Sequence, residues 1–435
     1  MTIKAQKYST YKSSGVEWIE DVPTHWEVKK FKRVFYEIRK RSNSKLNCGS
    51  ISFGKVVYKD DEKIPESTKR SYQVVLKGDF LVNPLNLNYD LISLRIALSD
   101  IDVVVSSGYI VLSNSVKLDK TYYKYFLHRF DVAFMKLLGS GVRQTLNWND
   151  IANCDLIFPP PPEQTAIANF LDRKTVLIDQ AVDIKQKQIE LLKERRQILI
   201  QQAVTRGLNA GAKLKDSGVE WIGKIPEGWE VKKLRYLANC FPSNVDKHSK
   251  ANEREVRLCN YTDVYKNDYI TNDLDLMIAT ASDEQINKFA LKEGDIVITK
   301  DSETASDIAV PTYIQETLKN VVCGYHLAII RTYQSSYSRY LYQALKTKLF
   351  NTQFEICSNG ITRVGLGNSD LKNGYFLLPT QKEQIQIADF IEKESFRIAT
   401  AISLKQQEIE KLKEYKATLI NSAVTGKIKV SNYDK

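Results

Sequence analysis

Residues 14–30 read SGVEWIEDVPTHWEVKK, and residues 217–233 read SGVEWIGKIPEGWEVKK. A second matching pair begins with EQTAIANFLDRKTVLIDQAVDIKQKQIELLKERRQILIQQAVT at Glu163 and EQIQIADFIEKESFRIATAISLKQQEIEKLKEYKATLINSAVT at Glu383. Between these segments the two halves agree only in short fragments. The repeat is far longer than a solenoid unit of roughly 20–45 residues. The sequence therefore predicts a duplicated chain of two domains, each followed by a helix, with similar edges and divergent interiors.

The second matching segment of each half has the pattern of a coiled coil. It has no internal Gly or Pro, and its apolar residues recur in heptads over some 40 residues, about 60 Å of helix. Lys185 and Arg196 interrupt the seam of the first helix, and Lys405 and Lys416 interrupt the second at the same places. The predicted seam residues are Leu171, Ile178, Val182, Ile189, Leu192, Leu199, Ile391, Ile398, Ile402, Ile409, Leu412 and Leu419.

Chain connectivity indicates how the two helices pair. The first helix ends near Thr205, and the linker RGLNAGAKLKD leads directly into the second domain, which then hands the chain to the second helix. The end of one helix and the start of the other must therefore lie near the same domain, which predicts antiparallel pairing and a pseudo-twofold repeat. The alternative is that each helix caps its own domain.

The fold class predicted is α+β, with two mixed α/β domains joined by two long antiparallel coiled-coil helices. Short β-rich runs such as SYQVVLKGDFLV alternate with turns, and one helical stretch follows in each half, beginning at Tyr122 and at Ser335. Gly108-Tyr109 of the first half corresponds to Gly324-Tyr325 of the second. The predicted boundaries are 1–158 and 207–378 for the two domains, and 159–206 and 379–428 for the two helices.

Composition narrows the classes of partner. Lys and Arg total 63 and Asp and Glu total 52, which gives a net charge of +11 in a chain that is 43% hydrophobic. This excludes a disordered chain and favours a polyanionic partner, either nucleic acid or an acidic membrane surface. No run approaches the ~18 apolar residues of a membrane span. The six cysteines are scattered without a C-x-x-C pair, so a soluble, cytoplasmic protein with reduced thiols is expected.

A search for catalytic motifs finds none that is complete. The sequence has no Gly-rich loop ending in Gly-Lys-Ser/Thr and no G-x-G-x-x-G, and its four histidines are far apart. Glu293, Asp295 and Lys300 fit two interpretations, a nuclease-like carboxylate cluster or a turn followed by a buried strand. Gly294-Asp295 recurs as Gly78-Asp79, which favours the turn. The sequence therefore predicts neither an active site nor a metal site.

With both repeats in view, the chain resembles the specificity (S) subunit of type I restriction–modification systems. The resemblance rests on SGVEWIEDVPTHWE and SGVEWIGKIPEGWE, on the helix starts PPPPEQTAIANFLD and PTQKEQIQIADFIE, and on the helix ends QQAVT and NSAVT. It covers essentially the whole chain.

The resemblance implies a non-catalytic subunit that binds double-stranded DNA through two target recognition domains. Each domain would read one half of a split, asymmetric sequence, and the helices would act as spacer and as dock for two methyltransferase (M) subunits. Endonuclease (R) subunits would complete the complex in a bacterial or archaeal cytoplasm. S-adenosylmethionine, ATP and Mg would serve that complex and not bind this chain.

Two other functions remain open at this point. One is an enzyme that fuses DNA recognition with methylation or cleavage, and the other is a DNA-binding scaffold without sequence specificity. The absence of catalytic motifs counts against the first. Binding that depends on salt concentration alone would mark the second.

Candidate DNA-contacting residues fall in two sets. Polar, glycine-led loops at matching places contain Arg143, Gln144 and Thr145 in one half and Thr362 and Arg363 in the other, and Arg and Gln can read base edges. The alternative is that each loop only closes its domain onto its helix. The second set is two basic strips that could contact phosphates or be solvated faces: Lys29, Lys30, Lys32 and Arg33, and Lys232, Lys233 and Arg235. Trp18, Trp26, Trp221 and Trp229 are expected to pack in the core or between domain and helix. The alternative is that they stack on bases.

Overall fold

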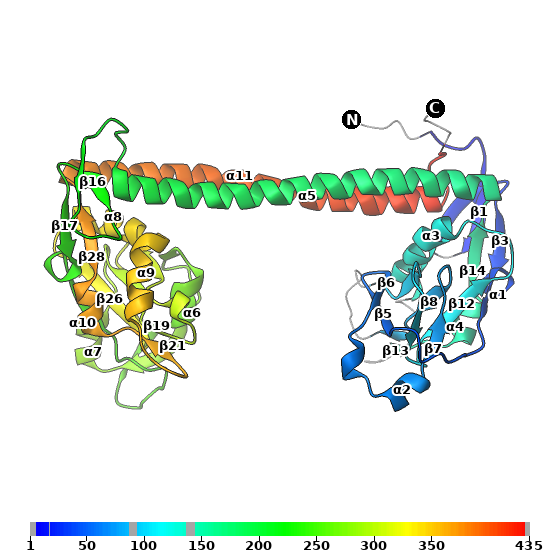
Figure 1. The fold of residues 1–435 in the computed structure, drawn as a ribbon, viewed down its shortest axis with the longest axis horizontal. Helices are drawn as coiled ribbons and strands as arrows, with labels where there is room; N and C mark the ends of the chain where they lie inside the picture. Colours follow the sequence, from blue (N-terminus) through cyan, green and yellow to red (C-terminus); the bar gives the residue numbers. More distant parts are fainter. Residues whose placement is uncertain (1–5, 17, 87–93, 136–143, 431–435) are drawn as a thin grey trace. The chain divides into compact units, whose positions relative to one another are not determined.

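The computed structural model describes residues 6–16, 18–86, 94–135 and 144–430. The chain forms two compact units: unit 1 comprises residues 1–185 and 407–435, and unit 2 comprises residues 186–406. Two long helices, α5 (Pro161–Arg206) and α11 (Gln381–Val424), each contribute to both units (Figure 1). Each unit therefore contains the start of its own helix and the end of the other one. The alternative in which each helix caps only its own domain does not hold.

Unit 1 is built on short antiparallel strands. A four-stranded sheet has the order β10-β8-β12-β4 and is flanked by the two-stranded pairs β1-β2, β5-β6, β11-β7, β13-β9 and β14-β3. The strand bounds are β1 Tyr11–Val16, β2 Ile19–Pro23, β3 Glu27–Lys30, β4 Phe35–Glu37, β5 Gly49–Ser52, β6 Lys55–Tyr58, β7 Gln73–Val75, β8 Phe80–Val82, β9 Leu85–Asn86, β10 Ile96–Leu98, β11 Val103–Val105, β12 Ile110–Asn114, β13 Gln144–Thr145 and β14 Asp155–Phe158.

The helices of unit 1 cover this sheet and build an aromatic core. They are α1 (Phe31–Val34), η1 (Asp61–Lys63), α2 (Glu66–Arg70), α3 (Lys120–Ala133) and α4 (Trp148–Ala152), besides α5. Helix α3 begins with Asp119 as its N-cap, whose carboxylate accepts from the Tyr122 amide. It buries its tyrosines and phenylalanines against β8, β12 and the start of α5. This is the helix expected from Tyr122 onward.

Unit 2 has larger sheets, and two of its strand pairs are parallel. Its five-stranded sheet has the order β18-β26-β22-β24-β20, and a three-stranded sheet has the order β21-β19-β25. The pairs β20·β24 and β19·β25 are parallel. The strand bounds are β15 Leu214–Asp216, β16 Lys224–Pro226, β17 Glu230–Lys233, β18 Ala238–Pro242, β19 Arg254–Cys259, β20 Tyr269–Ile270, β21 Met277–Ala281, β22 Ile296–Thr299, β23 Asp301–Ser302, β24 Pro311–Ile314, β25 Val321–Cys323, β26 Leu327–Thr332, β27 Val364–Gly365 and β28 Tyr375–Leu378.

The helices of unit 2 are η3 (Leu234–Tyr236), α6 (Tyr261–Lys266), α7 (Asp283–Phe289), η4 (Ala305–Asp307), α8 (Ser335–Leu345), α9 (Lys348–Cys357) and α10 (Asn368–Asn373), besides α11. The stretch expected as one helix from Ser335 is two, because Thr347 caps a new helix through the Phe350 amide. The core of unit 2 joins α8, α9 and the five-stranded sheet to both long helices.

The repeated sequence phrases meet in the same way in both units. In unit 1, β3 pairs antiparallel with β14, and in unit 2, β17 pairs antiparallel with β28. Trp26 Nε1 donates to Glu163 Oε2 at 3.0 Å, and Trp229 Nε1 donates to Glu383 Oε1 at 3.2 Å. Both tryptophans are buried. The WE and EQ motifs are therefore structural partners that attach each domain to the start of its helix. The other two tryptophans, Trp18 and Trp221, are partly exposed and pack against phenylalanine rings.

The ends of the long helices are anchored equivalently. Tyr122 of α3 donates its hydroxyl to the Val424 carbonyl at 2.9 Å, and Tyr340 of α8 donates to the Val204 carbonyl at 2.8 Å. The last carbonyls of a helix have no partner within it, so a buried tyrosine that satisfies one fixes that end in the domain. The AVT motifs at both helix ends therefore dock into the opposite repeat's domain.

Ion pairs show the direction of the two helices within unit 1. Asp179 of α5 pairs with Lys416 of α11 at 2.7 Å, and Lys185 pairs with Glu408 at 2.6 Å. The partner number falls as the position in α5 rises, so the helices are antiparallel. In unit 2 the end of α5, including Ala203, packs in one core with the start of α11. This confirms the antiparallel pairing predicted from the connectivity.

A pH-dependent test follows from Glu163, whose carboxylate accepts from Trp26, from His25 Nε2 at 2.6 Å and from Tyr8 OH at 2.8 Å. Burial raises the pKa of Glu163 and these hydrogen bonds lower it, with a net pKa below its ordinary value. A lowered pKa stabilises the fold above the unfolded-state value near 4.5 and loses that effect as the pH falls through the folded-state value.

We expect Glu163→Gln to lower the free energy of unfolding by about 1 kcal/mol near neutral pH, because the lost contacts are to a charged but partly exposed group. The difference should shrink below about pH 4, where the wild-type carboxylate also takes up a proton. Urea unfolding of the full chain at both pH values measures it, with the exposed Glu190→Gln as control. An equal loss at both pH values would contradict the role of the charge.

Candidate DNA interface

Two short strand pairs hold the candidate base-reading loops, one in each unit. In unit 2, Thr362 and Arg363 directly precede β27, which pairs with β23. In unit 1, Gln144 and Thr145 form β13, which pairs with β9. Arg143 lies outside the described residues. Because each pair is followed by a short helix, α4 or α10, the two loops occupy corresponding places in the repeats.

The loop before β27 makes a narrow turn that requires glycine at position 360. The Asn359 amide donates to the Gly365 carbonyl at 3.1 Å, and the Gly365 amide donates back at 2.9 Å. Between them Gly360 has φ +148°, and a Cβ there would lie 1.9 Å from the Arg363 carbonyl oxygen. Any larger residue would collide with the backbone. The turn thus presents residues 361–363, all of them exposed.

Arg363 is part of a polar cluster that joins three elements. Its Nη1 lies 3.1 Å from Nε2 of His326, and Nδ1 of His326 lies 3.1 Å from Oδ2 of Asp301. Lys300 Nζ also binds the Asp301 carboxylate, at 2.9 and 3.0 Å. We call Lys300, Asp301, His326 and Arg363 the Arg363 cluster. It lies where β23 meets β27, next to the turn that precedes β26.

Sequence reasoning missed this cluster because its members are distant along the chain. It treated His326 as one of four isolated histidines. The available signal was Gly324-Tyr325, which matches Gly108-Tyr109 and marks the turn that carries His326. Pairing of β22 with β26 then brings Thr299 opposite Leu327, and with them the residues on either side.

The carboxylate cluster considered from the sequence is instead a turn. Asp295 is buried, accepts from the Lys292 amide at 2.9 Å and pairs with Arg331 at 2.7 Å. This contact raises the pKa of Arg331. Asp79 makes the same turn contact in unit 1, with the Leu76 amide at 2.9 Å. The repeated Gly-Asp pair therefore closes a turn before a buried strand in both units.

A loop that contains two lysines lies beside the turn that carries His326. Val245 forms a parallel bridge with Gly324, and its carbonyl accepts from the Tyr325 amide at 2.7 Å. From there the chain enters segment 246–253, whose residues are exposed except for the half-buried Glu253, and which we call the 246–253 loop. It contains two lysines and two acidic residues, and Lys250 pairs with Glu253. The exposed Lys247 suits a contact to phosphate.

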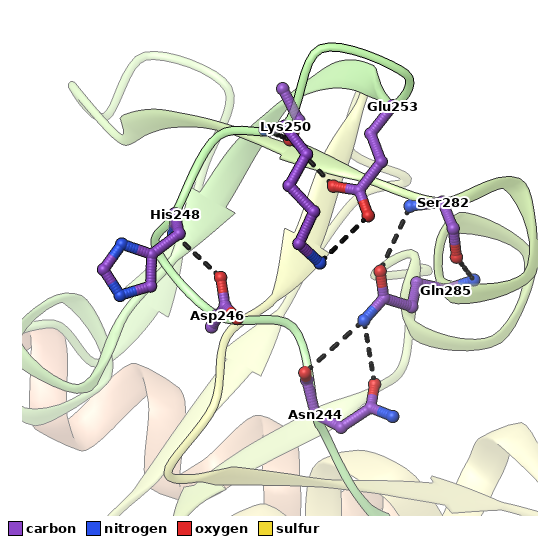
Figure 2. A network of polar contacts seen from close by, with 8 residues as sticks. Asn244, Asp246, His248, Lys250, Glu253, Ser282 and Gln285 are labelled. Carbon is purple, nitrogen blue, oxygen red and sulfur yellow. Dashed lines mark hydrogen bonds and ion pairs between the residues drawn. The ribbon is translucent and has the colours of Figure 1, made fainter.

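Polar contacts link residues of the 246–253 loop to one another and to neighbouring elements (Figure 2). Gln285 Nε2 donates to the Asn244 side chain at 3.2 Å, and its Oε1 accepts from the Ser282 amide at 3.1 Å. The Asp246 carboxylate accepts from the His248 amide at 2.8 Å, and Lys250 Nζ lies 3.3 Å from Glu253. The loop is thus pinned at both ends.

The two lysine strips are largely engaged with their own frames. Lys30 pairs with Asp155 at 2.8 Å, Lys32 donates to Asn153 at 2.8 Å and Lys232 pairs with Glu230 at 2.9 Å. The remaining lysines lie over aromatic rings, Lys29 at 3.8 Å from the Phe158 centroid and Lys233 at 5.4 Å from that of Tyr375. The strip arginines, Arg33 and Arg235, are exposed. Asp155 and Phe158 of β14 and Tyr375 of β28 come beside these lysines through strand pairing, whereas Glu230 lies on the same strand as Lys232.

The predicted seam residues lie on the buried sides of α5 and α11. They are buried or half-buried in the structure. The buried members are Leu171, Ile178, Ile189, Ile391, Ile398, Ile409 and Leu419, and the half-buried ones are Val182, Leu192, Leu199, Ile402 and Leu412.

Two further searches cover the described part of the chain only. Within it, no three His, Cys, Asp or Glu side chains gather in a way that could hold a metal ion. No helix there is long and apolar enough to span a membrane.

Comparison with known proteins finds one family in both halves of the chain. The family described as the type I restriction modification DNA specificity domain matches it twice, at residues 26–194 and 226–414. Two relatives come from Methanocaldococcus jannaschii. The MjaVIII type I restriction enzyme specificity subunit is 23% identical over 76% of this chain and 75% of its own length. The putative MjaX specificity subunit is 23% identical over 99% of this chain and 100% of its own.

Solved structures share the fold. A chain from a study of complex assembly and conformational transition of the type I R-M system has a TM-score of 0.69, at 14% identity, over 93% of this chain and 98% of that one. The HsdS subunit from Thermoanaerobacter tengcongensis has a TM-score of 0.55, at 15% identity, over 94% and 98%. With a family match in both repeats, the chain belongs to the specificity subunits of type I restriction–modification systems, which are the non-catalytic, DNA-recognising subunits of those enzymes.

Proposed function

We propose that this chain reads a split, asymmetric DNA sequence, with one half-site for each unit. The main support is that a repeated frame surrounds unlike interiors: a four-stranded sheet in unit 1 and a five-stranded sheet in unit 2. Equivalent loops on unlike interiors carry different side chains, and direct base readout depends on those side chains. Two units with different reading side chains therefore lead to two different half-sites. The net charge of +11 suits the phosphate contacts that such binding needs.

We assign residues 1–158 and 207–378 as the two target recognition domains and residues 159–206 and 379–428 as the spacer helices that set the distance between half-sites. S-adenosylmethionine, ATP and Mg²⁺ would act in the M and R subunits of the complex, which we place in the cytoplasm of a bacterium or archaeon.

Two matched apolar patches support the docking of two M subunits. In unit 1, Val176 and Ile184 of α5 are 53% and 56% exposed. In unit 2, Phe396 and Leu404 of α11 occupy the equivalent repeat positions and are 74% and 55% exposed. Large apolar side chains that are exposed on successive turns of a helix are typical of interaction surfaces. One such surface in each repeat fits two copies of the same partner.

Acidic substitutions test this docking. Val176→Asp with Ile184→Asp should leave one M subunit bound, Phe396→Asp with Leu404→Asp should do the same, and all four together should leave none. Light scattering of the co-purified complex gives the subunit number. Gln186→Asp with Gln406→Asp, at matched exposed positions beside the patches, is the control. Retention of two M subunits by the fourfold variant would place the docking surface elsewhere.

Mapping methylated sites tests the function itself. DNA from cells that carry this chain with its M partner should be methylated at one split motif with two different halves. The purified chain alone should transfer no methyl group from S-adenosylmethionine to DNA. Methylation by the chain alone would support an enzyme that fuses recognition with chemistry, and sequence-independent binding of the M complex would support a scaffold.

A further inference from the structure

We propose that Arg363 reads a guanine in the half-site of unit 2, and that His326, held by Asp301, is the positioning residue that fixes the arginine for this contact. The inference rests on the proposed function and adds to it one base and the side chains that select it. It depends on hydrogen-bond chemistry in the Arg363 cluster, on the geometry of the His326 turn and on the exposed Lys247 in the 246–253 loop beside it.

The contact between Arg363 and His326 determines the state of the histidine. A guanidinium has only N–H donors, so Nε2 of His326 must accept from Nη1 of Arg363 across 3.1 Å. The proton of the neutral ring is then on Nδ1, where it donates to Asp301 Oδ2 at 3.1 Å. Asp301 therefore selects the tautomer that can hold the arginine.

The cluster leaves the arginine able to bind a base. Asp301 shares its carboxylate with Lys300, so the four side chains together keep one positive charge. The neutral histidine occupies Nη1 only, and the Nε and Nη2 edge of the guanidinium has the two donors that match O6 and N7 of guanine. A lysine could not supply that planar pair of donors.

The backbone around His326 is fixed in an unusual conformation. His326 has φ +64°, in the left-handed region that non-glycine residues seldom adopt. Its carbonyl accepts from the Lys300 amide at 2.8 Å, and the Tyr325 ring packs on its imidazole at 4.3 Å between centroids. Such conformations persist where the surrounding structure imposes them and are concentrated at functional sites. The imidazole therefore has little freedom to leave Arg363.

Phosphate contacts next to a reading residue fix its register on the duplex. The 246–253 loop offers Lys247 for such a contact, because the carbonyl of Val245, directly before this loop, accepts from the Tyr325 amide in the His326 turn. Lys247 is exposed, whereas Lys250 pairs with Glu253.

The test uses the complex of the full chain with its M partner and a duplex that carries the mapped motif. Replacing each guanine of the motif with 7-deazaguanine removes N7 and leaves base pairing intact. At one guanine, wild-type affinity should fall about 10-fold, and Arg363→Ala and Arg363→Lys should show no such dependence. The same two variants should lose about 10- to 100-fold discrimination at that position.

His326→Phe tests the positioning role. It should lower the discrimination about 5- to 10-fold, and the double variant with Arg363→Ala should be no worse than Arg363→Ala alone, because both remove one contact. His326→Asn keeps a side-chain acceptor and tolerates the left-handed backbone, so it should restore part of the discrimination. Thermal unfolding of each variant separates this effect from loss of the fold.

Three results would overturn the inference: motif guanines that all tolerate 7-deazaguanine, additive losses in the double variant, or Arg363→Ala that weakens all sequences alike and reduces the salt dependence, as a phosphate contact would. A wild-type complex without any sequence-specific motif is a different outcome, because it would refute the proposed function itself.

Discussion

Exchange of residues 30–158 for the same segment of another specificity subunit will change one half of the methylated motif completely and leave the other half unaltered. The segment begins at the end of β3 and ends with β14, so the strand pairing that joins it to the frame is retained if the β14 pattern is kept. Trp26 and Glu163, which attach the frame to α5, lie outside the exchanged segment. Unit 2 is not altered by the exchange.

The incoming segment must meet one structural condition. Tyr122 lies within it and donates to the Val424 carbonyl at the end of α11, so the donor segment needs a tyrosine at the equivalent place. A segment from a subunit with the same half-site serves as control and should leave the motif unchanged. Methylation mapping in cells determines the motif of the exchanged chain and that of the control. A change in both halves would show that the two units do not read DNA independently.

The parts of the fold that the sequence revealed are those encoded twice. The Trp26 and Trp229 motifs, the Glu163 and Glu383 helix starts and the heptad seam each occur in both halves, so their shared role could be inferred without coordinates. The antiparallel direction also followed, because a short linker leaves the chain no length to return to the other end of the helix. Local patterns and chain length together determined these features.

Strand pairing within each domain could not be inferred, because its partners are far apart in sequence and differ between the halves. β19 pairs with β25 in parallel, and β23 pairs with β27, although the two strands of each pair are far apart in the chain. Alternating apolar residues predict that a strand exists and which of its faces is buried, but many partners satisfy the same pattern. The strand pairing inside the two diverged domains could therefore be determined only from the structure.

The same limit explains why the sequence pointed to the lysine strips as DNA contacts and missed the partners of Arg363. Lys29, Lys30 and Lys32 form a cluster in the sequence, yet β14 brings Asp155 and Phe158 beside them and engages two of the three. Arg363 was found because its loop is repeated. Its partners, His326 and Asp301, were not, since they reach it only through the β22–β26 and β23–β27 pairs. Tertiary contacts of this kind leave no spacing rule in the sequence.

The length of the two long helices should set the number of base pairs between the half-sites. One heptad is added to each helix, after Gln188 in α5 and after Glu408 in α11, within about one turn of the places where the chain passes from one unit to the other. Seven residues restore the phase of the apolar seam. Duplicating residues 182–188 and 402–408 also puts a glutamate before Ile409 again, so that Lys185 regains the partner it has in Glu408.

Each helix then grows by about 10 Å, at 1.5 Å per residue, which corresponds to about three base pairs at roughly 3.4 Å each. We expect a methylated motif with both halves unchanged and a spacer about three base pairs longer. The longer spacer also turns one half-site by roughly 100° about the DNA axis, so some affinity is lost unless the DNA twists or bends to compensate.

An insertion of four residues in α5 alone shifts the seam and should impair folding or assembly. If the double-heptad variant methylates the original motif with its original spacer, the helices do not determine the spacing, and the two units must be placed on DNA by the partner subunits.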